Sequence, residues 1–217
     1  MLNKGAQCEL KIYSGRAELE LAISNGNCSL DIFRRLLQAF PNKQARTRCI
    51  WLIGGGTRGK TVEFIQELVS AGVSLEARDR YGRTPLTAHV RDEGIFESLL
   101  KCGSQLDAVD SQGQGCLQQF VSTPGSYNSV ERLRKLVEIG LNPLSLDING
   151  NNLLHVAAYH YRGTSEDVTF IQQLIDFGIS VNSKNNLGAT PLHLHIEYGR
   201  VGSSDNQKTR ARLLELS

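Results

Sequence analysis

Apolar and polar positions recur along residues 68–217 in one frame, which two series of glycines mark. Four and three residues before each glycine of the first series stands an apolar pair, as in Leu68-Val69, and four residues after each glycine of the second series stands a leucine. The first series is Gly72, Gly103, Gly140 and Gly178, and the second is Gly82, Gly113, Gly150 and Gly188. An apolar pair just before a glycine is typical of the last turn of an amphipathic helix, which the glycine ends in a left-handed conformation.

The polar segment between the two glycines of each unit predicts a turn that leads into a new helix. Three residues before each second-series glycine stands a side chain with an acceptor oxygen: Asp79, Asp110, Asp147 or Asn185. Such an oxygen can accept backbone N–H groups two residues on, and glycine tolerates the positive φ of the turn. Thr84-Pro85-Leu86 and Thr190-Pro191-Leu192 then start helices, because proline needs no N–H partner in a first turn. Each unit is therefore expected to contain a polar finger, an inner helix, a turn and an outer helix.

This pattern resembles the ankyrin repeat, a unit of about 33 residues that starts with T-P-L-H-x-A. Thr190-Pro191-Leu192-His193 matches this start, residues 84–87 nearly do, residues 152–157 keep its second half, and residues 115–118 are a degenerate copy. The resemblance implies an all-α, ankyrin-type helical solenoid of about six repeats with short finger hairpins.

The repeats cover nearly the whole chain, so we expect a single ankyrin-repeat domain over residues 1–217. Its expected parts are a degenerate N-terminal repeat at 1–41, an atypical repeat at 42–78, clear repeats at 79–109, 110–146 and 147–184, and a C-terminal repeat at 185–217. The last repeat stops at the place of a capping glycine, so we expect either a parent protein that continues or a partial cap. Extra residues at 122–126, 162–165 and 202–205 are either tolerated surface insertions or a second binding edge.

Residues 54–61 fit the phosphate-binding motif G-x-x-x-x-G-K-[ST] in full. The preceding residues 49–53 could be a strand, and residues 62–68 are a plausible helix. A phosphate-binding loop of this class also needs a parallel sheet and a later acid for Mg²⁺, whereas Asp110 and Asp147 already belong to the predicted turns. We therefore favour a structural loop between two helices, with phosphate or nucleotide binding as the alternative.

Residues 32–62 carry seven basic side chains and no acid: Arg34, Arg35, Lys43, Arg46, Arg48, Arg58 and Lys60. The segment is either a docking patch for an acidic or phosphorylated partner or a solvated surface whose acids come from elsewhere in the fold. The formal net charge of the whole chain is only +2, so a nucleic-acid partner is not expected.

The remaining composition excludes several classes of protein. Five scattered cysteines without a C-x-x-C pair exclude a disulfide scaffold and a zinc ribbon, and they suit an intracellular compartment. No apolar run approaches the roughly 18 residues of a membrane-spanning helix. His155 and His193 stand at the T-P-L-H position, where the resemblance implies a structural role, and His160 and His195 lack companions at metal-ligand spacing. We expect no metal, no cofactor and no catalytic residue, and hence no enzyme.

The resemblance implies a non-catalytic protein–protein interaction module that binds a partner protein on the concave face of the fingers and inner helices. An interaction module of a larger effector or scaffold is a further alternative. Tyrosine and arginine most often carry interface energy, so we expect anchors at Tyr81, Arg83, Tyr159 and Tyr198. The expected partner-binding residues are Arg80, Tyr81, Arg83, Gln112, Gln114, Asn149, Asn151, Tyr159, Tyr161, Tyr198 and Arg200.

Overall fold

A computed structural model describes residues 19–20, 23, 28–39, 42–53, 59–122, 129–160 and 165–198 of the 217-residue chain. Every regular element within these residues is a helix, which confirms the all-α prediction. The chain divides into two compact units. Unit 1 comprises residues 1–77 and 97–103, and unit 2 comprises residues 78–96 and 104–217.

Unit 1 contains α2 (Leu30–Ala39), α3 (Lys43–Trp51) and α4 (Thr61–Ser70), and both α2 and α3 pack on α4. The Asn42 side chain starts α3 by accepting hydrogen bonds from the backbone N–H groups of Gln44 and Ala45, as an N-cap residue does. The rings of Phe33 and Phe64 lie with their centroids 5.0 Å apart between α2 and α4. The apolar faces of these helices therefore supply the core of unit 1.

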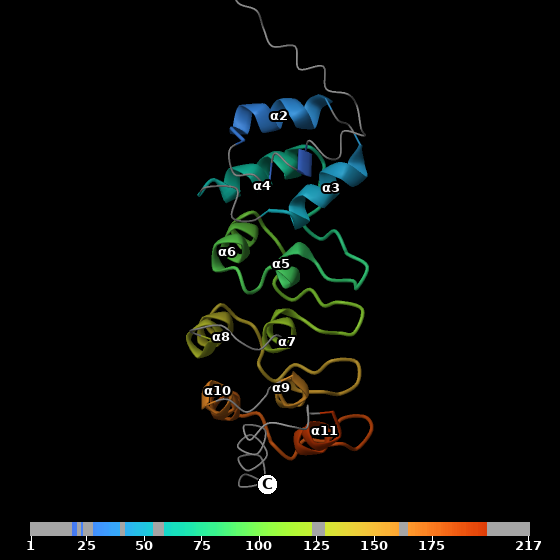
Figure 1. The fold of residues 1–217 in the computed structure, drawn as a ribbon, viewed down its shortest axis with the longest axis vertical. Helices are drawn as coiled ribbons and strands as arrows, with labels where there is room; N and C mark the ends of the chain where they lie inside the picture. Colours follow the sequence, from blue (N-terminus) through green and yellow to red (C-terminus); the bar gives the residue numbers. More distant parts are fainter. Residues whose placement is uncertain are drawn as a thin grey trace, which may run out of the picture. The chain divides into compact units, whose positions relative to one another are not determined.

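Unit 2 contains the inner helices α5 (Pro85–Ala88), α7 (Cys116–Val121), α9 (Leu153–His160) and α11 (Pro191–Tyr198). Its outer helices are α8 (Ser129–Glu138) and α10 (Ser165–Asp176), and α6 (Glu93–Lys101) begins in unit 2 and ends in unit 1. Along unit 2, α5 packs on α7, α7 on α9 and α9 on α11, while α8 packs on α10 (Figure 1). Stacked neighbours of this kind are what a solenoid requires.

The leucines of the repeating frame are buried, as the sequence predicts. Leu99, Leu136 and Leu174 near the ends of the outer helices are each 0% exposed, and Leu86 and Leu117 on the inner helices are at most 2% exposed. In unit 2 the rings of Phe120 and Phe170 add a contact at 6.3 Å between centroids. Burial at these periodic positions is the main favourable term that holds the helices together.

The first-series glycines end their helices in the left-handed conformation. Their φ angles lie between +84° and +107°, at Gly72, Gly103, Gly140 and Gly178. Each of their N–H groups bonds a carbonyl of the last helical turn, as Gly140 does to Val137 at 2.9 Å. The predicted glycine caps are therefore confirmed.

Candidate partner-binding surface

Four loops of unit 2 share one local structure, and we call residues 79–83, 110–114, 147–151 and 185–189 the Asx loops. In each loop the first side chain accepts hydrogen bonds from the N–H groups of the third and fifth residues. Asp147 Oδ1 accepts from Asn149 N at 2.8 Å and Asn151 N at 2.9 Å, and Asn185 Oδ1 accepts from Leu187 N and Ala189 N at 3.0 Å each. The predicted turns are therefore confirmed as Asx turns.

Successive Asx loops are also joined to one another through their backbones. Ser111 N donates to Tyr81 O at 3.1 Å, Ile148 N to Gln112 O at 3.0 Å, and Asn186 N to Asn149 O at 2.9 Å. At Gly82 the positive φ of +80° coincides with a close approach, because a Cβ there would lie 2.7 Å from Ser111 N. The loops consequently form one connected row, and the loops before α7, α9 and α11 project to the same side (Figure 1).

The predicted residues at the loop tips differ in how far the fold already uses them. Arg80, Tyr81, Gln112 and Asn149 are exposed. The guanidinium carbon of Arg80 lies 4.7 Å from the centroid of the Tyr81 ring, which is a cation–π distance. These four side chains are available to a partner.

Three other predicted residues are engaged within the loops. Arg83 Nε and Nη2 lie 2.9 Å and 2.8 Å from Asp79 Oδ2, and Gln119 Nε2 donates to Gln114 Oε1 at 3.3 Å. Asn151 Nδ2 donates to Asp147 Oδ2 at 3.0 Å, and its Oδ1 accepts from Asn185 Nδ2 at 2.9 Å. We infer that Arg83, Gln114 and Asn151 contribute more to the shape of the loops than to contact with a partner.

The Asp79 carboxylate shows the electrostatic effect of this engagement. Burial alone would raise its pKa, but hydrogen bonds from the Arg83 side chain and from the backbone N–H groups of Arg83 and Tyr81 outweigh burial. The pKa of Asp79 therefore lies below its ordinary value, and the carboxylate stays ionised as the acceptor of its loop.

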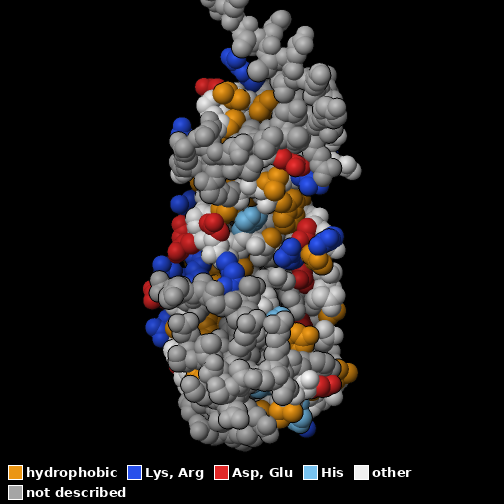
Figure 2. Space-filling model, in the orientation of Figure 1, with side chains coloured by type: hydrophobic (Ala, Val, Ile, Leu, Met, Phe, Trp, Pro, Cys, Tyr) orange, Lys and Arg blue, Asp and Glu red, His pale blue; other side chains and the backbone are white. Residues whose placement is uncertain are grey.

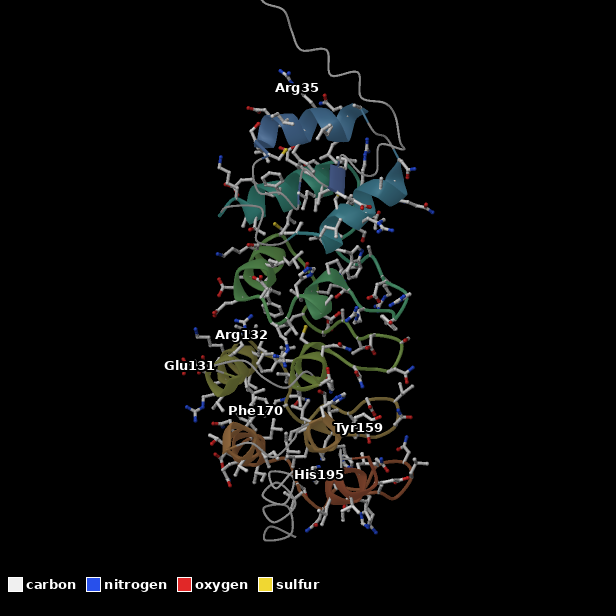
Figure 3. The ribbon with its side chains drawn as sticks, viewed as in Figure 1. Arg35, Glu131, Arg132, Tyr159, Phe170 and His195 are labelled. Atoms are coloured by element: carbon white, nitrogen blue, oxygen red, sulfur yellow. The ribbon has the colours of Figure 1, made fainter. Side chains whose placement is uncertain are left out.

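The predicted residues at the inner-helix ends are only partly described. Tyr159 lies on α9 with 51% of its surface exposed, and its ring stands edge-on to His160 at 5.0 Å between centroids (Figure 3). Tyr198 is the last residue of α11, and its side chain is outside the described part of the structure. Tyr161 and Arg200 also lie outside the described residues, as do the loop insertions predicted as a possible second edge, except for Ser122 and Ser165.

His155, His193 and His195 of unit 2 bond to backbone groups, which for His155 and His193 fits the structural role implied by the resemblance. His155 is 1% exposed, and its Nε2 donates to Ala189 O at 3.0 Å. Burial lowers the pKa of His155 below 6.5, so the neutral form is favoured. His193 Nδ1 accepts from Thr190 N at 3.1 Å. The sequence did not indicate the role of His195, whose Nδ1 donates to Ala158 O at 2.8 Å and so joins α11 to α9 (Figure 3).

The described residues offer little chemistry of other kinds. Burial raises the pKa of both Cys49 and Cys116 to about 12, so neither thiol supplies a thiolate at neutral pH. Across the described ranges, no group of three or more His, Cys, Asp or Glu side chains could hold a metal ion. In the same part of the chain, no helix is both long and apolar enough to cross a membrane.

The glycine-rich motif at residues 54–61 has a helix before it and not a strand. Helix α3 extends to Trp51, so the strand considered for residues 49–53 is wrong. Residues 54–58 lie outside the described part of the chain, whereas Lys60 is exposed and directly precedes α4. A phosphate-binding loop of this motif follows a strand, so the segment fits the structural alternative of a connection between α3 and α4.

Much of the charge in the basic segment at residues 32–62 has partners in unit 1. Arg34 pairs with Glu67 at 2.5 Å, and Arg48 pairs with Glu20 at 2.8 Å. Arg46 donates to the carbonyl oxygens of Leu37 and Ala71 at 2.6 Å and 3.1 Å. Since the pairing acids lie outside residues 32–62, these contacts support the solvated-surface alternative over a docking patch.

Three exposed apolar residues near two Asx loops were not singled out from the sequence. They are Val109, Leu144 and Leu146, with exposed fractions of 44% to 58%. Comparing the repeats in register would have found them, because the first and last repeats of the row carry polar or charged residues at the equivalent positions. Exposed apolar clusters often mark interaction surfaces.

Comparisons with known proteins give distant relatives and no match to a family model. The chain is 28% identical over 144 residues to the human "Transient receptor potential cation channel subfamily A member 1". It is 29% identical over 160 residues to mouse "Rabankyrin-5", and 28% identical over 145 residues to "Ankyrin repeat protein OPG189" of Variola virus. These matches cover 65%, 63% and 63% of this chain, and 12%, 13% and 25% of the relatives.

Proposed function

We propose that this chain, a relative of ankyrin-repeat proteins, is a protein-binding module whose partner docks on the Asx loops and the adjoining ends of the inner helices. The kinship confirms the resemblance inferred from the sequence. In the proposal the Asx loops are the fingers of about six repeats that make one domain over residues 1–217. The module has no catalytic role.

The observation that carries the proposal is the bonding of the Asx loops. Asp110 Oδ1 accepts from Gln112 N at 2.8 Å and Gln114 N at 2.9 Å, and the same pair of bonds recurs in the other three loops. In each Asx loop the side chain of the first residue thus holds the backbone of the loop, while tip residues such as Gln112 stay exposed. A surface that is already ordered loses little conformational entropy when a partner binds.

Two arginines of the outer helix α8 bond neighbouring helices. Arg132 on α8 is paired with Glu93 at 3.1 Å, and its guanidinium carbon lies 5.1 Å from the Phe96 ring centroid (Figure 3). Arg134 donates to Gln173 on α10 at 2.8 Å through Nε. Because these groups already hold α6, α8 and α10 together, the loop tips are the better candidates for recognition.

The proposal is tested with a partner isolated by affinity capture and identified by mass spectrometry. Alanine at Arg80, Tyr81 or Tyr159 should weaken binding about tenfold or more, as loss of an interface anchor does. Glu131→Ala is the control, because Glu131 is an exposed charge on α8, and it should change affinity less than about twofold. Normal binding by the three loop and inner-helix variants, with loss in Glu131→Ala, would place the interface on the outer helices.

A further inference from the structure

A cavity of about 280 Å³ opens in unit 2 beside two successive Asx loops. The segments that lead into these loops line it with Leu106 and Val109 from one repeat and Leu141 and Leu146 from the next. The start of α7 contributes Leu117, which is 2% exposed. The cavity is therefore an apolar pocket that neighbouring repeats build together.

The polar side chains that also line the pocket are mostly occupied by the chain itself. Gln118 Nε2 donates to Ser145 O at 3.2 Å and to Ser145 Oγ at 2.9 Å. Asn142 Oδ1 accepts from Leu144 N at 2.9 Å. Asp107 is exposed and supplies the carboxylate of the lining. With the amides committed to the fold, the pocket favours an apolar group over a polar ligand.

The apolar surface around the pocket is confined to the two middle repeats of the row. The residue just before each Asx loop is Arg78, Val109, Leu146 or Lys184 in chain order. The second residue of each loop is Arg80, Ser111, Ile148 or Asn186. On the side of unit 2 to which the Asx loops project, Figure 2 shows apolar side chains among charged ones. The exposed patch therefore belongs to particular residues of this chain and not to the repeat pattern as such.

The size of the pocket restricts what it can hold. Pockets for drug-sized ligands and cofactors occupy about 300–1,000 Å³, so 280 Å³ lies just below that range. A single large apolar side chain presented by another protein fits this volume. Such a side chain, desolvated in a pocket, is the usual anchor of a protein interface.

Two arginines give the neighbouring end of the surface a positive charge. Arg78 Nη1 donates to the carbonyl oxygens of Gly82 and Val109, so its charge is held against a residue that lines the pocket. Arg80 contacts the Tyr81 ring. None of the ion pairs among the described residues involves Arg78 or Arg80. A partner that supplies a carboxylate here would form charge-assisted hydrogen bonds.

We propose that this pocket binds one large apolar side chain of an extended partner segment, and that Arg78 and Arg80 bind a carboxylate of the same segment. The inference rests on the proposed function, which it deepens by naming the chemistry that the surface recognises. It assigns to the pocket residues a role separate from that of Tyr81 and Tyr159.

The test is selection of linear peptides from a random phage-displayed library on the intact chain, followed by fluorescence anisotropy with the enriched peptides. Enriched peptides should share a large apolar residue and a nearby acid. Val109→Asp and Leu146→Asp should each reduce affinity about thirtyfold or more, because a charge would occupy the apolar site.

Matched controls place aspartate at apolar positions of similar exposure that neither line the pocket nor belong to the Asx loops. Val69 is 41% exposed against 44% for Val109, and Ile32 is 53% exposed against 58% for Leu146. Val69→Asp and Ile32→Asp should leave affinity within about twofold. Melting curves of all four variants identify any that fail to fold, and the alanine variants at the same positions then replace them.

The carboxylate contact is tested from both sides. Arg80→Gln should lower the affinity for an enriched peptide about threefold to tenfold, and so should replacing the acidic residue of that peptide by its amide. Measured together, the two changes should lower affinity little more than either change alone, because the two groups contact each other. Arg80 suits this test because its guanidinium contacts the Tyr81 ring and forms none of the ion pairs found among the described residues.

Three results would overturn the inference: no enriched peptide, enriched peptides without the apolar and acidic pair, or peptides that bind Val109→Asp normally. If such peptides instead depend on Tyr81 and Tyr159, the inference fails and the proposed function stands. If they depend on the outer helices alone, the proposed function fails as well.

Discussion

The connections between helices are held by different interactions in the two units. In unit 2 each Asx loop takes its shape from one Asp or Asn side chain and a glycine within a few residues, as in the loop at 147–151. In unit 1, Asn42 caps α3 in a similar local way, but Lys60 at the start of α4 makes no side-chain cap, and Arg46 bonds Leu37 O and Ala71 O at the ends of α2 and α4. Because the local hydrogen bonds of unit 2 recur at equivalent positions, successive loops have the same shape and form a regular surface. The long-range hydrogen bonds of a single arginine produce no such regular surface.

This contrast explains why the binding surface is proposed for unit 2. A loop whose backbone is satisfied by its own residues can vary its exposed tip without loss of fold. Arginines such as Arg34 and Arg46, by contrast, already bond other groups of unit 1. The basic segment at 32–62 is therefore a poorer candidate for recognition than its charge suggests.

The largest loss of stability is expected from truncating the buried leucines of unit 2 to alanine. Leu136→Ala or Leu174→Ala should lower the free energy of unfolding by about 2–5 kcal/mol, because each side chain is fully buried and leaves a cavity. Urea denaturation measures the change, and Leu187→Ala is the control because Leu187 is 87% exposed. Equal losses from all three variants would mean that the stacking does not hold unit 2 together.

The next effect concerns the Asx loops themselves. Asp147→Ala removes the acceptor of two backbone N–H groups and of Asn151 Nδ2, and it should cost about 1–3 kcal/mol. Asp147→Asn should cost less, because Asn185 fills the same place in its own loop. Thermal melts compare the two variants with Lys60→Ala in unit 1, which should change stability by less than about 0.5 kcal/mol. A Lys60→Ala loss as large as that of Asp147→Ala would erase the distinction between the units.

The sequence predicts the parts of the fold that depend on neighbours in the chain. Glycine caps, Asx turns and buried leucines follow from spacing alone, and Asp110, Gly113 and Leu117 all behave as expected. The acid partners of the basic segment could not be predicted, because Glu67 lies 33 residues from Arg34. The engagement of Asn151 could not be predicted either, since it depends on Asn185 of the next loop.

One substitution in unit 2, at Ser104, should raise the free energy of unfolding of the chain. Ser104 is 8% exposed, and its hydroxyl has no hydrogen-bond partner among the described residues. The equivalent positions after the other capping glycines hold Val73, Leu141 and Ile179. Ser104→Val should therefore stabilise the chain by about 1 kcal/mol, by removing an unpaired buried hydroxyl. Ile179→Ser, the reverse change in the same register, should destabilise it, and a stabilised Ile179→Ser would contradict this account.

The smallest effect is a dependence on pH that arises in unit 2. Burial lowers the pKa of His155 and His160 below 6.5, so the unfolded chain takes up protons first as the pH falls. The free energy of unfolding should therefore be highest above pH 6.5 and should decline below it. Urea midpoints between about pH 7.5 and pH 5 measure the slope, and His155→Gln should flatten it. A slope unchanged in His155→Gln would assign the dependence to other groups.

Hydrogen exchange with a bound partner or selected peptide tests the central claim most directly, because it reads every backbone amide of the intact chain in one experiment. We expect slower exchange on binding at residues 79–83, 109–115 and 146–151, with little change in α8 and α10. Protection confined to α8 and α10, with the Asx loops unaffected, would contradict it.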